Sequence, residues 1–166
     1  MRKIGLLLLT VMGIFSCGVQ QPRGELVYCS YACAGAAGLG KDYCELIADE
    51  GSEPKVVVVL DEGNRFGDPV IHEEYPVERS VVVSLQELLA TIKFYKLDGY
   101  NLEEPITGGH SYRLHAEYSS GEKLNAYWYG NGVKDKVLDA YFRISAFFNP
   151  WREKAEALAR EKKPLQ

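Results

Sequence analysis

The sequence predicts an α+β domain, an antiparallel sheet with two main helices packed on one of its faces. Several short segments rich in β-forming residues are joined mostly by short turns with glycine or proline, which favours antiparallel pairing. Two later segments carry apolar residues at helical spacing, so each has a stripe that must be buried. An antiparallel sheet commonly leaves one face in water, so both helices are expected on the other face.

The N-terminus has the composition of an export signal. Met1-Arg2-Lys3 is basic, residues 4–15 carry no charge, and the small Ser16 follows them. This order is typical of a secretory signal, and the run is too short for a membrane-spanning helix, which needs about 20 apolar residues. Residues 1–16 are therefore predicted to be a signal peptide.

Residues 14–17, Ile-Phe-Ser-Cys, resemble the lipobox of bacterial lipoproteins. In that family an aliphatic residue, a tolerant position and a small residue precede the cysteine that is lipidated and becomes the first residue. The resemblance implies that Cys17 carries acyl chains, palmitate among them, and several chains form a durable membrane anchor. Residues 17–24 would then be the lipidated cysteine and a short tether. Cleavage without lipidation, followed by secretion, is the alternative.

The residue after the cysteine carries information on the target membrane. Gly18 stands where an aspartate would mark inner-membrane retention in many Gram-negative bacteria. The resemblance therefore implies an outer-membrane anchor facing the periplasm if the host is Gram-negative. In layout, the mature part also resembles the small bacterial lipoproteins of unknown function that have one α+β domain. That likeness carries no functional residue over.

Without its signal peptide the chain runs from Cys17 to Gln166, which is long enough for one domain. Removing Arg2 and Lys3 leaves 17 basic side chains against 23 acidic ones, so the net charge is −6. Contact with nucleic acid needs a basic footprint, so no nucleic-acid partner is expected. Residues 25–150 are assigned to the single domain, and residues 151–166 to a polar helical tail.

Three cysteines remain besides the lipidated one: Cys29, Cys33 and Cys44. An odd number in an oxidising compartment leaves one thiol over. Residues 34–40 are rich in glycine and alanine, and strands on both sides of them would bring Cys33 near Cys44. A Cys33–Cys44 disulfide is therefore the first expectation and Cys29–Cys44 the second. Three free thiols are the remaining outcome.

The first half of the domain is predicted to be mostly β-structure. Residues 25–33 and 43–48 form two strands of a wide hairpin. Residues 55–60, Lys-Val-Val-Val-Val-Leu, are a β-branched run typical of a strand covered on both faces. Residues 65–74 are predicted to be loop, and residues 75–83 an extended segment.

The first helix is predicted to begin at Ser84. Glu87 lies three residues further on, which is the spacing of a capping box, and Gly99 supplies a C-terminal stop. The apolar stripe of this helix consists of Leu85, Leu88, Leu89, Ile92 and Tyr95.

The second helix is predicted over residues 134–148. Asn149-Pro150 should interrupt it, and residues 152–163 should form a solvated C-terminal helix because they offer only a narrow apolar edge. The buried side of the second helix is predicted to consist of Val137, Leu138, Tyr141, Ile144 and Phe148.

Between the helices, residues 112–118 and 124–128 alternate apolar and polar side chains. A loop of Ser119-Ser120-Gly121 with Gly121 in the left-handed conformation sets one register. The apolar pairs are then Tyr112–Trp128, Leu114–Ala126 and Ala116–Leu124, and the polar pairs are Arg113–Tyr127, His115–Asn125 and Glu117–Lys123. A shorter loop would mix the two faces, which a half-buried sheet does not permit.

The polar face of this hairpin is the best candidate binding surface: Arg113, His115, Glu117, Asn125 and Tyr127. Such groups can hold an anion or a sugar, or act as acid and base, although an ordinary solvated sheet face is the plainer interpretation. The leading hypothesis is a lipid-anchored envelope protein, more consistent with a binding module than with an enzyme, which binds a partner protein or an envelope component. No cofactor is expected.

Two other functions remain as alternatives. A small envelope hydrolase would use His115 and Glu117, which a substrate would have to bring together. An inhibitor of a basic enzyme would rest only on the charge of −6.

Other motifs lack the features of known sites. Residues 35–40 have the spacing G-x-x-G-x-G and not the dinucleotide-binding G-x-G-x-x-G, so a flexible hairpin loop is expected. The segment His72-Glu73-Glu74-Tyr75 lacks the second histidine of a zinc-protease helix, and Pro76 follows it, so it is predicted to be exposed loop. The cysteine spacing lacks the paired CxxC motifs of structural zinc sites. No metal site with His72, His110 or His115 is therefore expected.

Overall fold

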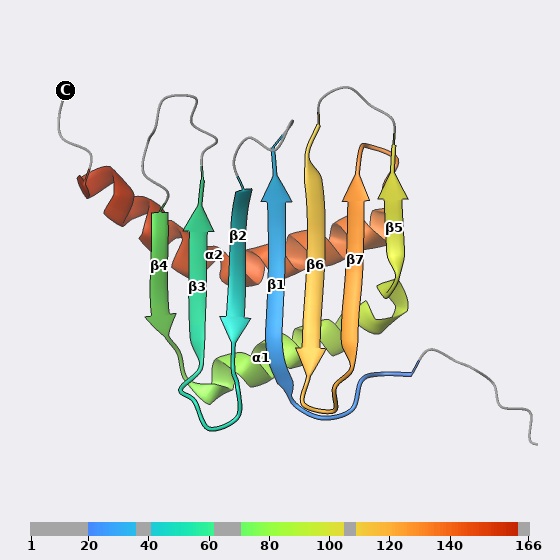
Figure 1. The fold of residues 1–166 in the computed structure, drawn as a ribbon, viewed down its shortest axis with the longest axis horizontal. Helices are drawn as coiled ribbons and strands as arrows, with labels where there is room; N and C mark the ends of the chain where they lie inside the picture. Colours follow the sequence, from blue (N-terminus) through green and yellow to red (C-terminus); the bar gives the residue numbers. More distant parts are fainter. Residues whose placement is uncertain (1–19, 36–40, 62–70, 105–108, 163–166) are drawn as a thin grey trace, which may run out of the picture.

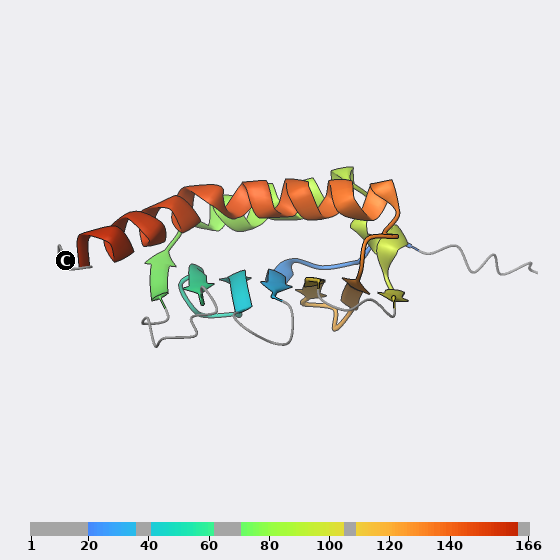
Figure 2. The same cartoon turned by 90° about the horizontal axis from the view of Figure 1, so that it is seen from above.

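The computed structural model describes residues 20–35, 41–61, 71–104 and 109–162. In these ranges a seven-stranded sheet is packed against two long helices that lie on the same face (Figures 1 and 2). The predicted α+β class, with the helices on one face, is confirmed. The predicted signal peptide, Cys17 and residues 36–40 of the glycine-rich loop lie outside the described residues.

The sheet has the strand order β4-β3-β2-β1-β6-β7-β5. Neighbouring strands are antiparallel, except that β5 pairs parallel with β7 at the edge. This short edge strand was not predicted, because a four-residue segment has too little alternation to be recognised. The strands are β1 (Leu26–Ala34), β2 (Lys41–Ile47), β3 (Lys55–Leu60), β4 (Ile71–Pro76), β5 (Tyr100–Glu103), β6 (Ser111–Tyr118) and β7 (Lys123–Tyr129).

The β6–β7 hairpin has the predicted register at all six pairs. Gly121 has a φ of 86°, the left-handed conformation that the three-residue loop requires. The loop is closed by the Tyr118 amide, which donates to the Glu122 carbonyl at 3.0 Å. Local alternation and one glycine were therefore sufficient to fix this hairpin.

The strand β3 is buried along Val56–Leu60, as its composition predicts. Val56 and Val58 face the helices, whereas Val57 lies on the other face between Glu45 and Glu74 of the adjacent strands. The long side chains of Glu45 and Glu74 therefore lie on both sides of Val57 on that face. The segment from His72 to Glu74 belongs to β4 and not to a loop, so that prediction is wrong. The segment is a strand because its backbone pairs with that of β3.

Helix α1 (Arg79–Thr91) begins five residues before the predicted N-cap Ser84, with Glu78 as its N-cap. The predicted capping box is not used, and residues 79–83 are helical and not extended. Starting early buries Val82 beside Leu85 and Leu89, and packing of this kind outweighs a local capping preference.

The C-terminal end of α1 also differs from the prediction. The helix ends at Thr91, and a short 3-10 helix, η2 (Phe94–Leu97), precedes Gly99. Gly99 has a φ of 72° but follows η2, so it is not the stop of α1. The left-handed residue directly after α1 is Lys93, with a φ of 54°.

Helix α2 (Asp135–Lys162) is one helix of 28 residues that continues through Pro150. The predicted interruption and the separate polar tail are therefore wrong. A proline inside a helix costs about 3 kcal/mol because it removes a hydrogen bond and crowds the preceding turn. Burial of Ala155 and partial burial of Trp151 offset this cost, since they continue the packed side of the helix onto the sheet. Figure 2 shows the C-terminal part of α2, in red, inclined towards β4.

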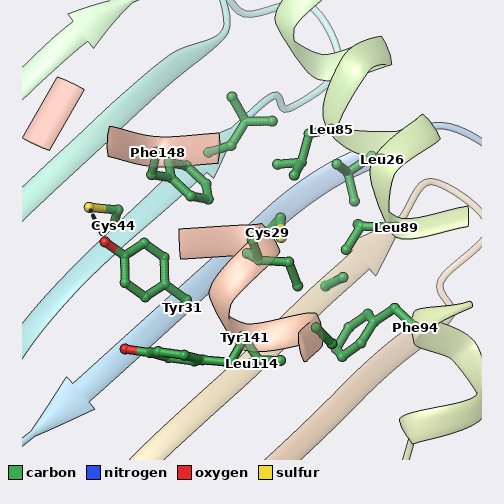
Figure 3. Packing of buried hydrophobic residues seen from close by; sticks show 14 of the residues in the cluster. Leu26, Cys29, Tyr31, Cys44, Leu85, Leu89, Phe94, Leu114, Tyr141 and Phe148 are labelled. Carbon is green, nitrogen blue, oxygen red and sulfur yellow. Dashed lines mark hydrogen bonds between the residues drawn. The ribbon is translucent and has the colours of Figure 1, made fainter. Parts of the chain in front are cut away.

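The core lies between the helices and the inner face of the sheet, as Figure 3 shows for Leu85 and Leu89 of α1, Phe148 of α2, and Leu114 of β6. Each predicted stripe supplies buried residues. In α1 the buried residues are Val82, Leu85 and Leu89. In α2 they are Val137, Ala140, Tyr141, Ile144, Phe148 and Ala155.

The three described cysteines are free thiols, so neither predicted disulfide is formed. Cys44 lies directly opposite Tyr31, and its thiol donates to the Tyr31 hydroxyl at 3.4 Å (Figure 3). Cys29 and Cys33 are therefore both diagonal to Cys44, where Cα atoms are about 7–8 Å apart, which is too far for a disulfide without backbone movement. Burial raises the pKa of Cys29 to about 12 and that of Cys44 to about 11.

Candidate functional site

The five residues of the predicted binding surface lie on the sheet face that points away from the helices, which we call the outer face. Arg113, His115 and Glu117 project from β6, and Asn125 and Tyr127 project from β7. They share one face because each alternates with a buried residue of the same strand. The structure thus brings all five predicted residues together.

His115 is the centre of this face because both of its ring nitrogens are in contact with a side chain. Nδ1 lies 2.6 Å from Oδ1 of Asn125, and Nε2 lies 2.7 Å from Oε1 of Glu117. Both ring nitrogens are therefore within hydrogen-bond distance of a side-chain oxygen of the same sheet face. The hydrolase hypothesis assumed that His115 and Glu117 need a substrate to meet. That assumption is wrong, because residues two apart on one strand face lie close enough for these long side chains to touch.

Glu117 is held by two cationic or hydrogen-bonding neighbours. Lys123 Nζ lies 2.8 Å from Oε2 of Glu117, on the oxygen that His115 does not use. The hydrogen bond from Lys123, and after it the one from His115, holds the pKa of Glu117 below its usual value. Both oxygens of the Glu117 carboxylate are therefore in contact with a neighbouring side chain.

Sequence reasoning missed two further members of the network, Tyr28 of β1 and Glu45 of β2. The ring of Tyr28 lies 5.5 Å from that of His115, and its hydroxyl donates to Oε2 of Glu45 at 2.5 Å. Burial, and then the hydrogen bond to Glu45, raises the pKa of Tyr28 far above its ordinary value. Alternation along β1 and β2 could have placed both residues on a polar face, but only the β1–β6 pairing brings them to His115.

The two remaining predicted residues, Arg113 and Tyr127, lie beside the network and contact each other. The Arg113 guanidinium carbon lies 5.9 Å from the centre of the Tyr127 ring, which is a cation–π contact. Arg113 is exposed and Tyr127 is half-buried. A planar cation on an aromatic ring is a common feature of protein interfaces, where arginine and tyrosine are enriched.

The side chains at the centre of the outer face are bonded to one another. A general base must be able to reach a substrate proton, yet both nitrogens of His115 are already bonded to neighbouring side chains. The hydroxyl of Tyr28 is likewise committed to Glu45. The network is thus a fixed set of donors and acceptors, and it lacks an activated nucleophile among the residues described above.

Neither a metal centre nor a membrane-spanning helix is found in the described ranges. No group of three or more histidine, cysteine, aspartate or glutamate residues there could hold a metal ion. No helix within residues 20–35, 41–61, 71–104 and 109–162 combines the length and hydropathy that crossing a bilayer requires. In comparisons with known proteins, no family model and no curated protein matches this chain.

Proposed function

We propose that this protein is a lipid-anchored protein of the cell envelope, attached through Cys17, and that its domain binds a partner protein through the outer face. The arrangement around His115 carries the second part of the proposal. Its six bonded side chains are held in place before any partner arrives, which lowers the entropic cost of association. Both described long helices lie on the other face (Figure 2), so a flat partner surface can approach this one.

The segment that follows the predicted anchor is held against the domain. Residues 20–24 are not a loose tether but are tied to the β6–β7 turn. The Arg23 amide donates to Oε2 of Glu122 at 2.6 Å, and the Ser120 hydroxyl donates to the Arg23 carbonyl at 2.5 Å. On the other side, the Gln86 amide donates to the Gly24 carbonyl at 3.2 Å.

These contacts limit the distance between the domain and a membrane to which Cys17 would be anchored. Gln21 already packs beside Leu89 and Tyr118. The chain from Cys17 to Gln21 spans at most about 14 Å when fully extended. A lipid on Cys17 would therefore hold the β6–β7 turn close to the bilayer.

Lipid attachment is tested with Cys17→Ser. We expect the wild type to be in the membrane fraction and to incorporate radiolabelled palmitate, and Cys17→Ser to lose both properties. A Cys17→Ser protein that still carries lipid would refute the anchor.

Partner binding is tested by crosslinking in cells followed by affinity purification. A partner captured by the wild type should be lost with the double variant Arg113→Ala, Tyr127→Ala. It should be retained with Lys136→Ala, Lys154→Ala, a matched pair of exposed residues on α2. Equal capture by both double variants would show that the outer face is not the binding surface. Circular dichroism of each variant checks that the fold is intact.

A further inference from the structure

A concave site, separate from the outer-face network, lies between α2 and the end of the sheet where β1 ends. It is a groove with a free volume of about 390 Å³. Small-molecule sites occupy about 300–1,000 Å³, so the groove has the size of a ligand pocket. Cys33 lines it near the end of β1, whereas the tethered residues 20–24 precede the start of that strand. The groove is therefore at the end of the sheet opposite the predicted anchor.

The wall of the groove is aromatic and rigid. Tyr112 stacks on Trp128 with 5.1 Å between ring centres and 14° between ring planes. Tyr141 stands edge-on to both rings, at 5.1 Å and 5.5 Å, and Tyr31 continues the cluster at 5.8 Å from Tyr141. In Figure 3 the hydroxyl ends of Tyr31 and Tyr141 point the same way, away from Leu26 and Leu89.

The rim of the groove has an apolar side chain that the fold leaves in water. Phe142 of α2 lines the groove and is 62% exposed, the highest value among the large apolar side chains of the described residues. Its ring touches that of Tyr141, with 5.8 Å between centres. Phe142 therefore extends the aromatic wall from the buried rings to the surface.

Buried within the wall is a donor that needs an acceptor. The indole Nε1 of Trp128 has no hydrogen-bond partner in the described part of the chain, although Trp128 is fully buried. Such a group costs free energy until an acceptor oxygen or water reaches it. Trp128 is one of the residues that line the groove, so this unpaired donor belongs to the groove's wall.

The guanidinium at the edge of the groove is already paired with carboxylates. Arg152 Nη2 lies 3.5 Å from Oδ2 of Asp42, and Arg152 Nε lies 3.0 Å from Oε1 of Glu156. Two carboxylates already neutralise the guanidinium, so an anion gains little here. A purely apolar ligand would bury this ion pair and the tyrosine hydroxyls without new partners, which is costly.

We propose that this groove binds a neutral saccharide. A sugar ring presents C–H groups on its faces, which pack on the electron-rich faces of aromatic rings. Its hydroxyls both donate and accept, so they match tyrosine hydroxyls, the Asp42 carboxylate, the Arg152 guanidinium and the amide of Asn131. This site is independent of the outer face, which lies on the other side of the sheet.

The proposal is tested by NMR titration of residues 17–166 carrying Cys17→Ser, labelled with nitrogen-15. The probes are two neutral disaccharides, chitobiose and cellobiose, with glucuronate and octanoate as comparators. We expect saturable shifts at Tyr112, Asn131 and Phe142 with a neutral disaccharide and not with the comparators. Saturable binding of octanoate alone would overturn the proposal in favour of a lipid groove, and binding of glucuronate alone would overturn it in favour of an anion site. No saturable shift with any probe would refute it as well.

Matched variants locate the binding. Phe142→Ala should weaken disaccharide binding about three- to tenfold, the range expected for one aromatic contact. Val83→Ala removes an apolar side chain of α1 that is also more than half exposed, and it should leave the affinity unchanged. The outer-face double variant Arg113→Ala, Tyr127→Ala should also bind normally, which separates this site from the proposed partner surface. Unchanged affinity in Phe142→Ala would overturn the proposal.

Discussion

The two faces of the β6–β7 hairpin have the same backbone but different roles. On the inner face, Leu114 and Trp128 are fully buried under the helices. On the outer face, His115 and Glu117 contact each other and their neighbours but stay partly accessible to solvent. Neighbouring residues of one strand therefore contribute either to the core or to a surface network, because successive side chains point to opposite faces. The comparison indicates that stability and recognition can be changed separately in this protein.

The largest difference is expected between Leu114→Ala and His115→Ala. Leu114→Ala should lower the free energy of unfolding by about 2–5 kcal/mol, because it opens a cavity in the core. His115→Ala removes two side-chain hydrogen bonds from a face that water reaches, and should cost about 1 kcal/mol. Urea unfolding measures both values. Equal losses would contradict the division of roles between the faces.

An intermediate difference is expected in the reactivity of the three thiols, which project from the inner side of β1 and β2. Cys29 and Cys44 are buried and their pKa values are raised, so both should react slowly with iodoacetamide in the native state. Cys33 is only half-buried and should be modified first. Mass spectrometry of the Cys17→Ser protein under non-reducing conditions counts the modified thiols. A Cys33–Cys44 disulfide would instead leave neither of these cysteines reactive.

The smallest effect concerns the acid stability of the outer face. The folded-state pKa of Glu117 lies below its ordinary value of 4.5, so its charge stabilises the fold above that pH. This stabilisation is lost as the pH falls through the folded-state pKa. Glu117→Gln should therefore flatten the decline of stability below pH 4.5, by less than about 1 kcal/mol because the site is partly exposed. The control Glu53→Gln, on an exposed turn, should keep the wild-type slope.

The hairpin and the helices show how far sequence reasoning reaches. For β6 and β7, alternation and Gly121 fixed the register and hence the five residues of the candidate site, because strand faces and a short loop are local properties. For α1, the local capping signal at Ser84 was weaker than the burial of Val82. For α2, the local signal of Pro150 was weaker than the packing of Trp151 and Ala155 against the rest of the domain.

The sequence by itself determined the fold class, most of the strands, the faces of the hairpin and its polar residues. Only the tertiary structure decided that β1 pairs with β6, which brings Tyr28 and Glu45 into the network of His115. The tertiary structure likewise placed α2 beside the end of β1, which forms the aromatic groove. Pairing between distant segments must offset the entropy of closing a long loop, so it depends on burial summed over the whole domain. No single segment of the sequence carries that information.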